Sequence, residues 1–225
     1  ACQAKLVNRV VIATDDERIA SAACQFKAEV VMTSPHCPTG TDRVAAVVER
    51  EEYKQYGLVV NVQGDEPLID PGMVDSCIRA ISMADNIVMT TARSFLEDPR
   101  EMFDPNVVKV VTDNKGLALY FSRSPIPFHR DTWGNSSSVR EMQGKDLEFE
   151  SVFKHIGLYV YRRDFLLKFR NLSPTPLEKI EKLEQLRALE HGFSIGVVLT
   201  ESKSYGVDVP EDIARVEKIL TGAKK

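Results

Sequence analysis

Short aliphatic and β-branched runs alternate with segments of helical periodicity in the first part of the chain. Short runs rich in β-branched residues, which are typical of buried strands, occur at 9–14, 29–33, 58–63 and 87–91. Apolar residues recur with the period of a helix at about 15–26, 40–52 and 71–84. This alternation predicts an α/β fold in which a doubly wound, mostly parallel sheet carries helices on both faces.

A β-rich portion begins near residue 105, where the regular alternation ends. Further strands are predicted at 107–112, 117–122, 155–161 and 195–199. The polar segment 125–151 predicts a long loop. Because no internal repeat or low-complexity linker interrupts the chain, we predict a single domain over residues 1–225, with a smaller β-rich portion at about 105–195.

Two more helices are predicted toward the end of the chain. Thr175 and Glu178 form a capping box around Pro176, which stands at the first helical position. This box opens a helix that Gly192 ends. The apolar pattern of 209–220 predicts the second helix.

Composition excludes several classes of protein. The net charge is −4 and no Lys/Arg cluster is present, which argues against nucleic acid as the main partner. No run of 18 apolar residues exists, so we expect no membrane span, and no signal peptide is visible. The four cysteines lack zinc spacing and are typical of reduced thiols. We therefore expect a cytoplasmic protein, or a piece of one, since the chain does not begin with Met.

Asp65 follows the strand predicted at 58–63, directly after Gly64. In an open parallel sheet, ligands bind beyond the carboxyl ends of the strands, and glycine lets a ligand approach the backbone. A carboxylate at this place suits Mg²⁺, which takes oxygen ligands and bridges proteins to phosphates. Asp65 could instead cap the next helix or stabilise a turn, and the Gly-Asp pair alone does not decide between these roles.

Asp208 lies in a second glycine-containing loop, between the last predicted strand and the last predicted helix. It could be a second metal ligand or the N-cap of that helix, with Pro210 at an early helical position. Both roles are compatible, because capping occupies one carboxylate oxygen only. The segment Thr39–Arg43 opens a helix whose free N–H groups and Arg43 could bind an anion. An ordinary capped helix with a surface arginine is the alternative.

Six motifs occur in one order over residues 1–221. They are Gly40–Arg43 (GTDR), Val62–Pro67 (VQGDEP), Ala118–Arg123 (ALYFSR), Pro176–Glu178 (PLE), Leu183–Arg187 (LEQLR) and Gly206–Asp208 (GVD). Together they resemble the 3-deoxy-manno-octulosonate (Kdo) cytidylyltransferases, which have a nucleotide-diphospho-sugar transferase-like fold. CMP-sialic acid synthetases share fold and reaction type, but the YFSR and LEQLR segments are more similar to the Kdo enzymes.

The resemblance implies a function and its cofactor. An enzyme of this family transfers CMP from CTP to Kdo, giving CMP-Kdo and pyrophosphate for lipopolysaccharide biosynthesis. It implies Mg²⁺ held by Asp65 and Asp208. It also implies a homodimer, with sugar binding and dimerisation in the portion at about 105–195. The alternatives are the same chemistry on another sugar acid, such as a sialic acid, and a non-catalytic nucleotide- or sugar-binding relative.

The resemblance also implies two sets of binding residues. The nucleotide would contact Thr39, Gly40, Thr41, Arg43 and Gln63. The sugar acid would contact Arg123, His155, Tyr159, Glu181, Glu184 and Gln185. His155 and Tyr159 lie four residues apart and so share one face of the predicted strand.

Each sugar-side residue also has a simpler interpretation. His155 could be a hydrogen-bonded core histidine, and Tyr159 could lie at the edge of the core. Glu181, Glu184 and Gln185 share a helical face that could be solvated. Arg123 suits a carboxylate because of its bidentate geometry, but a surface salt bridge is the alternative.

The family's opening segment has no counterpart in the printed sequence. Members begin with a strand and a loop that resembles Pro-Ala-Arg-x-x-Ser-x-Arg-x-Pro-Gly-Lys-Pro-Leu and contacts the triphosphate. Without such a strand, which is central in a doubly wound sheet, we expect two open sheet edges beside a large apolar area. If Ala1 is the true start, we expect little or no CTP turnover.

Overall fold

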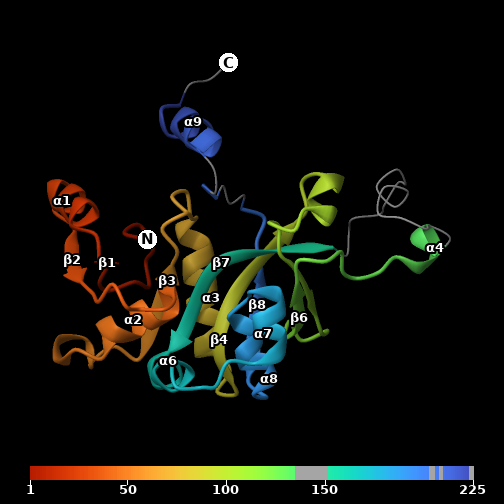
Figure 1. Ribbon diagram of the computed structural model, residues 1–225, viewed down its shortest axis with the longest axis horizontal. Coiled ribbons are helices and arrows are strands. Elements are labelled where there is room, and N and C mark those ends of the chain that lie inside the picture. Colours follow the sequence, from red (N-terminus) through yellow and green to blue (C-terminus); the bar gives the residue numbers. More distant parts are fainter. Residues whose placement is uncertain (135–151, 203–205, 208–209, 223–225) are drawn as a thin grey trace.

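The computed structural model describes residues 1–134, 152–202, 206–207 and 210–222 (Figure 1). Its strands form a two-stranded sheet, β1–β2, and a six-stranded sheet in the order β6-β5-β7-β4-β8, with β3 also paired to β7. The strands are β1 (Val11–Thr14), β2 (Glu29–Met32), β3 (Leu58–Val62), β4 (Ile87–Phe95), β5 (Lys109–Thr112), β6 (Ala118–Ser122), β7 (Phe153–Arg162) and β8 (Ser194–Leu199). The α/β class predicted from the sequence is confirmed.

Helices join most of these strands. They are α1 (Glu17–Gln25), α2 (Gly40–Val48), α3 (Pro71–Ser82), α4 (Arg130–Trp133), α6 (Arg163–Phe169), α7 (Pro176–Glu181), α8 (Gln185–Glu190) and α9 (Pro210–Leu220), with 3₁₀ turns η1 (Glu51–Tyr53) and η2 (Pro99–Phe103). Within the described ranges, every helix is too short or too polar to cross a lipid bilayer. Of the loop expected at 125–151, residues 135–151 lie outside the described part.

The large sheet is mixed, whereas the sequence pattern predicted a mostly parallel one. The pairs β1–β2 and β4–β8 are parallel, but β7 runs antiparallel to β3, β4 and β5. The cause is the course of β7, which leaves the β-rich portion beside β5 and then runs between β3 and β4. Alternation within β7 still separates the two faces of the sheet.

Two apolar clusters cover the two faces of the large sheet. Ile156, Leu158 and Val160 of β7 pack in the cluster under α3. Tyr159 and Tyr161 belong to the opposite cluster, which also takes residues from α2, α6 and α8. Figure 1 shows α3 and the α6–α8 group at either side of the sheet. At roughly 25 cal/mol per Å² of buried apolar surface, these clusters dominate the free energy of folding.

The helix predicted to run from Pro176 to Gly192 is divided into α7 and α8. Lys182, at the end of α7, adopts a left-handed conformation with φ of 56°. That conformation stops the helical hydrogen bonds, and α8 begins three residues later at Gln185. The sequence carries no glycine or proline at this point, so the break has no local signal there.

The small β1–β2 sheet lies beside β3 without pairing to it. Among the described residues, β1 pairs only with β2 and β3 pairs only with β7. A cleft of about 1150 Å³ is lined by both β1 and β3 and by apolar side chains that include Val11, Val47 and Val60. We call it the first cleft. Two open strand edges beside an apolar surface agree with the physical expectation for a sheet that lacks one interior strand.

Candidate active site

A second cleft, of about 800 Å³, lies at the carboxyl end of β3 and over the start of β7. Its lining is mainly polar and comes from segments far apart in the chain. Eight of the residues predicted from the sequence line it: Thr41, Gln63, Asp65, Arg123, His155, Tyr159, Glu184 and Gln185. The structure therefore brings together most of the predicted sugar-side residues, with part of the predicted nucleotide side.

Asp65 and Gln63 line both clefts. Gly40 and Arg43, predicted on the nucleotide side, line the first cleft, whereas Arg123 and His155 line the second. Asp65 therefore lies at the junction of the two.

Asp65 lies in an exposed turn directly after β3. Its backbone carbonyl accepts a hydrogen bond of 2.8 Å from the backbone N–H of Val207. This bond joins the loop before α9 to the turn after β3, although 142 positions of sequence separate the two. Asp208, the other predicted metal ligand, lies outside the described residues.

Gln63 extends over Gly157 of β7. A Cβ atom at position 157 would lie 3.3 Å from Gln63 Oε1 and 3.7 Å from Glu66 Oε1. The absence of a side chain at Gly157 thus lets two polar groups approach the floor of the second cleft. Sequence reasoning did not identify Glu66 as a lining residue, because it lies in the same motif as the stronger candidate Asp65.

His155 is fixed on the wall of the second cleft by Thr91 of β4. The Thr91 hydroxyl lies 2.8 Å from His155 Nε2 and donates to the Leu158 carbonyl at 2.7 Å. Because that hydroxyl has one hydrogen, it must accept from Nε2–H, which leaves Nδ1 as an unprotonated acceptor. Burial lowers the pKa of His155 to about 3, so the ring is neutral at pH 7.

The contact between Thr91 and His155 lies at a bulge in β7. Thr91 pairs with Tyr159 and Ala92 pairs with Ile156, so one step along β4 spans three along β7. The Thr91 hydroxyl oxygen lies 2.7 Å from the Leu158 carbonyl and 3.2 Å from the Ile156 carbonyl, both of which belong to the bulge. The bulge adds an even number of residues and therefore keeps His155 and Tyr159 on one face, as their spacing predicted.

Tyr159 stands between His155 and Tyr161, with ring centroids 5.4 Å and 5.9 Å away. It is 7% exposed, and burial raises its pKa well above the ordinary value. Tyr161 and Thr41 of α2 line the second cleft together. The row of rings connects β7 to the N-terminus of α2 and gives the cleft a rigid aromatic wall.

Arg123 follows β6 and reaches the rim of the second cleft. Its Nε donates to the Glu181 carbonyl and its Nη1 to the Pro105 carbonyl, both at 2.8 Å. Among the described residues, no carboxylate forms an ion pair with this guanidinium within 4.0 Å. The salt-bridge alternative is therefore not realised there, and the positive charge of Arg123 remains available to an anionic ligand.

Glu181 holds the segment around Arg123 in place. Its carboxylate accepts from Ser122 Oγ at 2.6 Å and from the Arg123 N–H at 2.9 Å. Glu181 is absent from the lining of the second cleft. Burial opposes its ionisation, but these hydrogen bonds lower its pKa below the ordinary value. Direct contact of Glu181 with a substrate stays a prediction.

The side-chain amide of Gln185, the first residue of α8, is buried without a hydrogen-bond partner for its nitrogen among the described residues. The residue is 4% exposed, yet its Nε2 is buried and has no hydrogen-bond partner in the described structure. A buried donor without a partner costs about 1–3 kcal/mol, unless a ligand or water accepts from it. Its position in the lining of the second cleft makes a ligand oxygen the natural acceptor.

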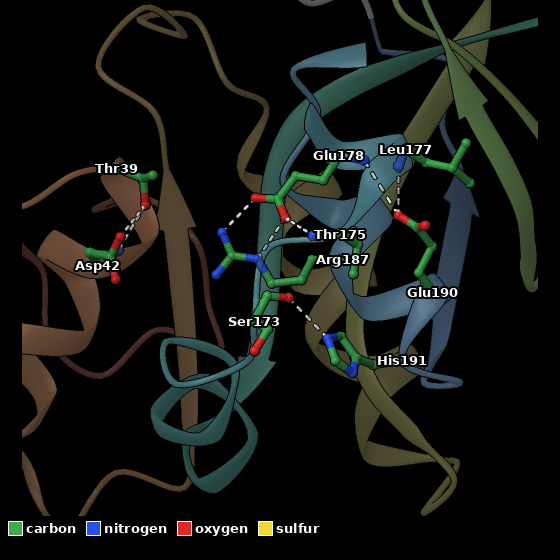
Figure 2. A network of polar contacts seen from close by, with 9 residues as sticks. All are labelled: Thr39, Asp42, Ser173, Thr175, Leu177, Glu178, Arg187, Glu190 and His191. Atoms are coloured by element: carbon green, nitrogen blue, oxygen red, sulfur yellow. Dashed lines mark hydrogen bonds and ion pairs between the residues drawn. The ribbon is translucent and has the colours of Figure 1, made fainter. Parts of the chain in front are cut away.

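The pair α7–α8 is held rigidly behind Gln185, as Figure 2 shows. The Glu178 carboxylate accepts from Arg187 Nε at 2.8 Å and from the Thr175 N–H at 3.2 Å, which is the Glu178 half of the predicted capping box. Glu190 of α8 accepts from the Leu177 N–H at the start of α7 at 3.1 Å. These contacts fix where α8 begins and hence where Gln185 lies.

The predicted nucleotide loop opens α2, where its polar groups bond to one another and to residues of the neighbouring loops. Thr39 caps the helix by accepting from the Asp42 N–H at 3.1 Å. Arg43 donates to Thr33 Oγ1 at 2.6 Å and pairs with Asp15 at 3.1 Å. Gly40 and Arg43 face the first cleft, Thr41 faces the second, and Thr39 lines neither.

Lys154 is a further lining residue that sequence reasoning missed. It precedes His155 on β7, and its Nζ lies 2.9 Å from Glu101 and 3.6 Å from Glu97. Because a lysine in a strand is ordinarily a surface residue, the sequence gives no local signal for this role.

The donors around Asp65 suit a hard cation. In the part of the chain that the structure describes, no group of three His, Cys, Asp or Glu side chains is arranged to hold a metal ion. Asp65 is exposed and Glu66 shares its cleft. Carboxylate oxygens of this kind suit Mg²⁺, which keeps few protein ligands and completes its shell with water and phosphate oxygens.

Comparison with known proteins identifies the family. A family model described as cytidylyltransferase matches residues 1–202. A 3-deoxy-manno-octulosonate cytidylyltransferase of Syntrophotalea carbinolica is 51% identical over 98% of this chain and 84% of its own length. That of Geobacter metallireducens is 50% identical over 97% and 84%. This chain belongs to the 3-deoxy-manno-octulosonate cytidylyltransferase family.

Solved structures agree with membership in the cytidylyltransferase family. A CMP:2-keto-3-deoxy-manno-octonic acid synthetase complexed with CTP superposes with a TM-score of 0.83 at 31% identity, over 99% of this chain and 85% of that one. A glucose-1-phosphate thymidylyltransferase of Bacillus anthracis gives a TM-score of 0.59 at 12% identity, over 96% and 77%. The second likeness shows the fold alone, which is that of nucleotidyltransferases.

Proposed function

We propose that this chain transfers CMP from CTP to Kdo, forming CMP-Kdo and pyrophosphate for lipopolysaccharide biosynthesis in the cytoplasm. One observation carries the proposal beyond family membership. The predicted nucleotide residues Thr41 and Gln63 line the second cleft together with Asp65 and with the sugar-side residues Arg123 and His155. A reaction between a nucleotide and a sugar acid needs both kinds of residue in one cleft.

The reaction requires mainly that the protein align its two substrates. The anomeric hydroxyl oxygen of Kdo forms a bond to the α-phosphorus of CTP, and the bond from that phosphorus to pyrophosphate breaks; the hydroxyl proton passes to solvent. Holding the two substrates in register removes much of the entropic barrier. We assign Arg123 to the Kdo carboxylate, because its charge has no paired carboxylate in the described residues.

The neighbouring side chains would orient the sugar. Neutral His155 offers Nδ1 as an acceptor, and Gln185 offers its unpartnered Nε2–H₂ as a donor. Tyr159 would supply an aromatic surface, and Glu184 lies in the same lining. An acceptor and a donor in the lining of one cleft suit the hydroxyl groups of a sugar.

Mg²⁺ is the cofactor that we propose, held by Asp65 and Asp208. When bound, it would neutralise charge on the α-phosphate and polarise the attacking hydroxyl. The 2.8 Å bond from the Val207 N–H to the Asp65 carbonyl supports this pair, because Asp208 is the next residue in the sequence.

We further propose a homodimer formed through the portion at about 105–195. Leu119 of β6 is 62% exposed and Ile180 of α7 is 78% exposed. The two elements are connected by the Glu181 contacts to β6. Exposed aliphatic side chains on neighbouring elements are typical of an interface between subunits.

The test is pyrophosphate release by the native gene product that carries this sequence, supplied with CTP and Mg²⁺, and with Kdo or a sialic acid. We expect release with Kdo and much less with the sialic acid, and little or no release if that product begins at Ala1. Calorimetric titration with CTP should be run in parallel. Metal-dependent CTP binding without turnover would favour the non-catalytic alternative, and a chain that binds neither substrate would contradict the proposal.

A further inference from the structure

Lys109, at the start of β5, is a fully buried lysine that the proposed chemistry does not use. Its side chain is 0% exposed. Its Nζ donates to three backbone carbonyls, those of Asp104 at 2.9 Å, Val107 at 2.6 Å and Arg123 at 2.7 Å. All three N–H groups of the ammonium are thereby used, each by a backbone oxygen.

The three carbonyls belong to two segments that meet at the rim of the second cleft. Residues Asp104 and Val107 flank a turn that lines the cleft, and Arg123 lines it from the end of β6. The Arg123 guanidinium bonds the same turn through the Pro105 carbonyl. Lys109 and Arg123 thus both donate to carbonyls of the turn 104–107. Lys109 also fixes the backbone of Arg123 by donating to its carbonyl.

We propose that Lys109 is a positioning residue for the acid substrate, which acts by holding Arg123 and the turn 104–107 in the geometry that receives the substrate carboxylate. The inference rests on the proposed function, because it assigns the carboxylate to Arg123. It goes beyond that function by naming a buried group that touches no substrate. A misplacement of about 1 Å in a binding group can cost up to about 100-fold in rate.

The charge of Lys109 is suited to a test by pH. Burial lowers the pKa of Lys109 to about 8. The charged groups that face it are Asp104, Glu181 and Arg123, and Lys154 is its partner residue on β7. Above pH 8 the neutral amine has two N–H groups for three carbonyls, so one carbonyl loses its donor.

The first experiment compares Lys109→Met with Lys115→Met, which changes an exposed lysine in the β5–β6 turn. For Lys109→Met we expect the KM for Kdo to rise at least about 10-fold, while the KM for CTP stays within about twofold. In an Arg123→Ala background the same change should raise the KM for Kdo less than about twofold, because the two residues act as one unit. Equal rises in the KM for Kdo and the KM for CTP would overturn the inference. An equally large rise in the KM for Kdo with and without Arg123→Ala would overturn it too.

A second measurement covers the case in which Lys109→Met does not fold. In the wild-type chain the KM for Kdo should rise as pH passes from 7.5 to 9.5, and Arg123→Ala should show no such rise. A rise that is the same in both proteins would contradict the inference. If neither wild type nor Lys115→Met turns over Kdo, the proposed function fails. In that case the positioning is measured by hydrogen exchange of segments 104–108 and 121–125 in the wild-type chain. After correction for intrinsic rates, exchange must be faster above pH 8.5 than at pH 7.

Discussion

Val207 donates its backbone N–H to the backbone carbonyl of Asp65 at 2.8 Å, and so fastens the loop before α9 to the turn after β3. The bond fixes the backbone of Asp65 from outside its own turn. Asp65 itself lies at the junction of the two clefts. The position of this carboxylate is therefore set by tertiary structure and not only by the local motif.

Asp65→Asn should remove most of the activity. The amide keeps the shape of the side chain but loses the charge that a divalent cation needs. We expect kcat/KM for CMP-Kdo formation to fall at least about 100-fold, equivalent to about 2.7 kcal/mol. Asp85→Asn changes an exposed aspartate elsewhere and should leave kcat/KM within about twofold. An Asp65→Asn enzyme with nearly normal activity at limiting Mg²⁺ would exclude Asp65 as a ligand.

Gly157→Ala should disturb the floor of the second cleft without unfolding the protein. The added Cβ would lie 3.3 Å from Gln63 Oε1, closer than most contacts, and the end of a flexible side chain can yield. We expect the unfolding midpoint to stay nearly constant while the KM for CTP rises at least about threefold. Gly57→Ala is the matched control, because nothing lies within 4 Å of a Cβ there. Equal KM values in the two variants would show that Gln63 does not contact the nucleotide.

The sequence predicted the elements of the site better than their arrangement. The spacing of His155 and Tyr159 placed both on one face, and the bulge in β7 preserves this relation. The break at Lys182 has no sequence signal, because a lysine seldom adopts the left-handed conformation that ends α7. The junction at Asp65 could not be deduced from spacing either, because it depends on a contact between distant loops.

His155 should make the free energy of unfolding depend on pH in a defined window. Burial lowers its pKa from 6.5 to about 3, so between these values the unfolded chain binds more protons than the folded chain. Stability is therefore lost as pH falls below 6.5. From pH 7 to pH 5 this histidine alone should remove about 2 kcal/mol, from 1.36 kcal/mol for each pKa unit.

Urea unfolding of wild type and His155→Gln at pH 7 and pH 5 isolates that contribution. The other titrating groups are common to both proteins and cancel in the comparison. Wild type should lose about 2 kcal/mol more than the variant, which carries no titrating group at position 155. If the two proteins lose the same free energy, His155 is not held neutral by burial.

Ile180→Glu should convert the proposed homodimer into monomers. The side chain is 78% exposed on α7, and a carboxylate there would be costly to bury against a partner subunit. Met83→Glu changes a side chain of similar exposure, 86%, at the end of α3 and should leave the assembly intact. Sedimentation at micromolar concentration should give a dimer for wild type and Met83→Glu, and a monomer for Ile180→Glu. A monomeric wild type would remove the dimer from the proposal, and a dimeric Ile180→Glu would move the interface to another surface.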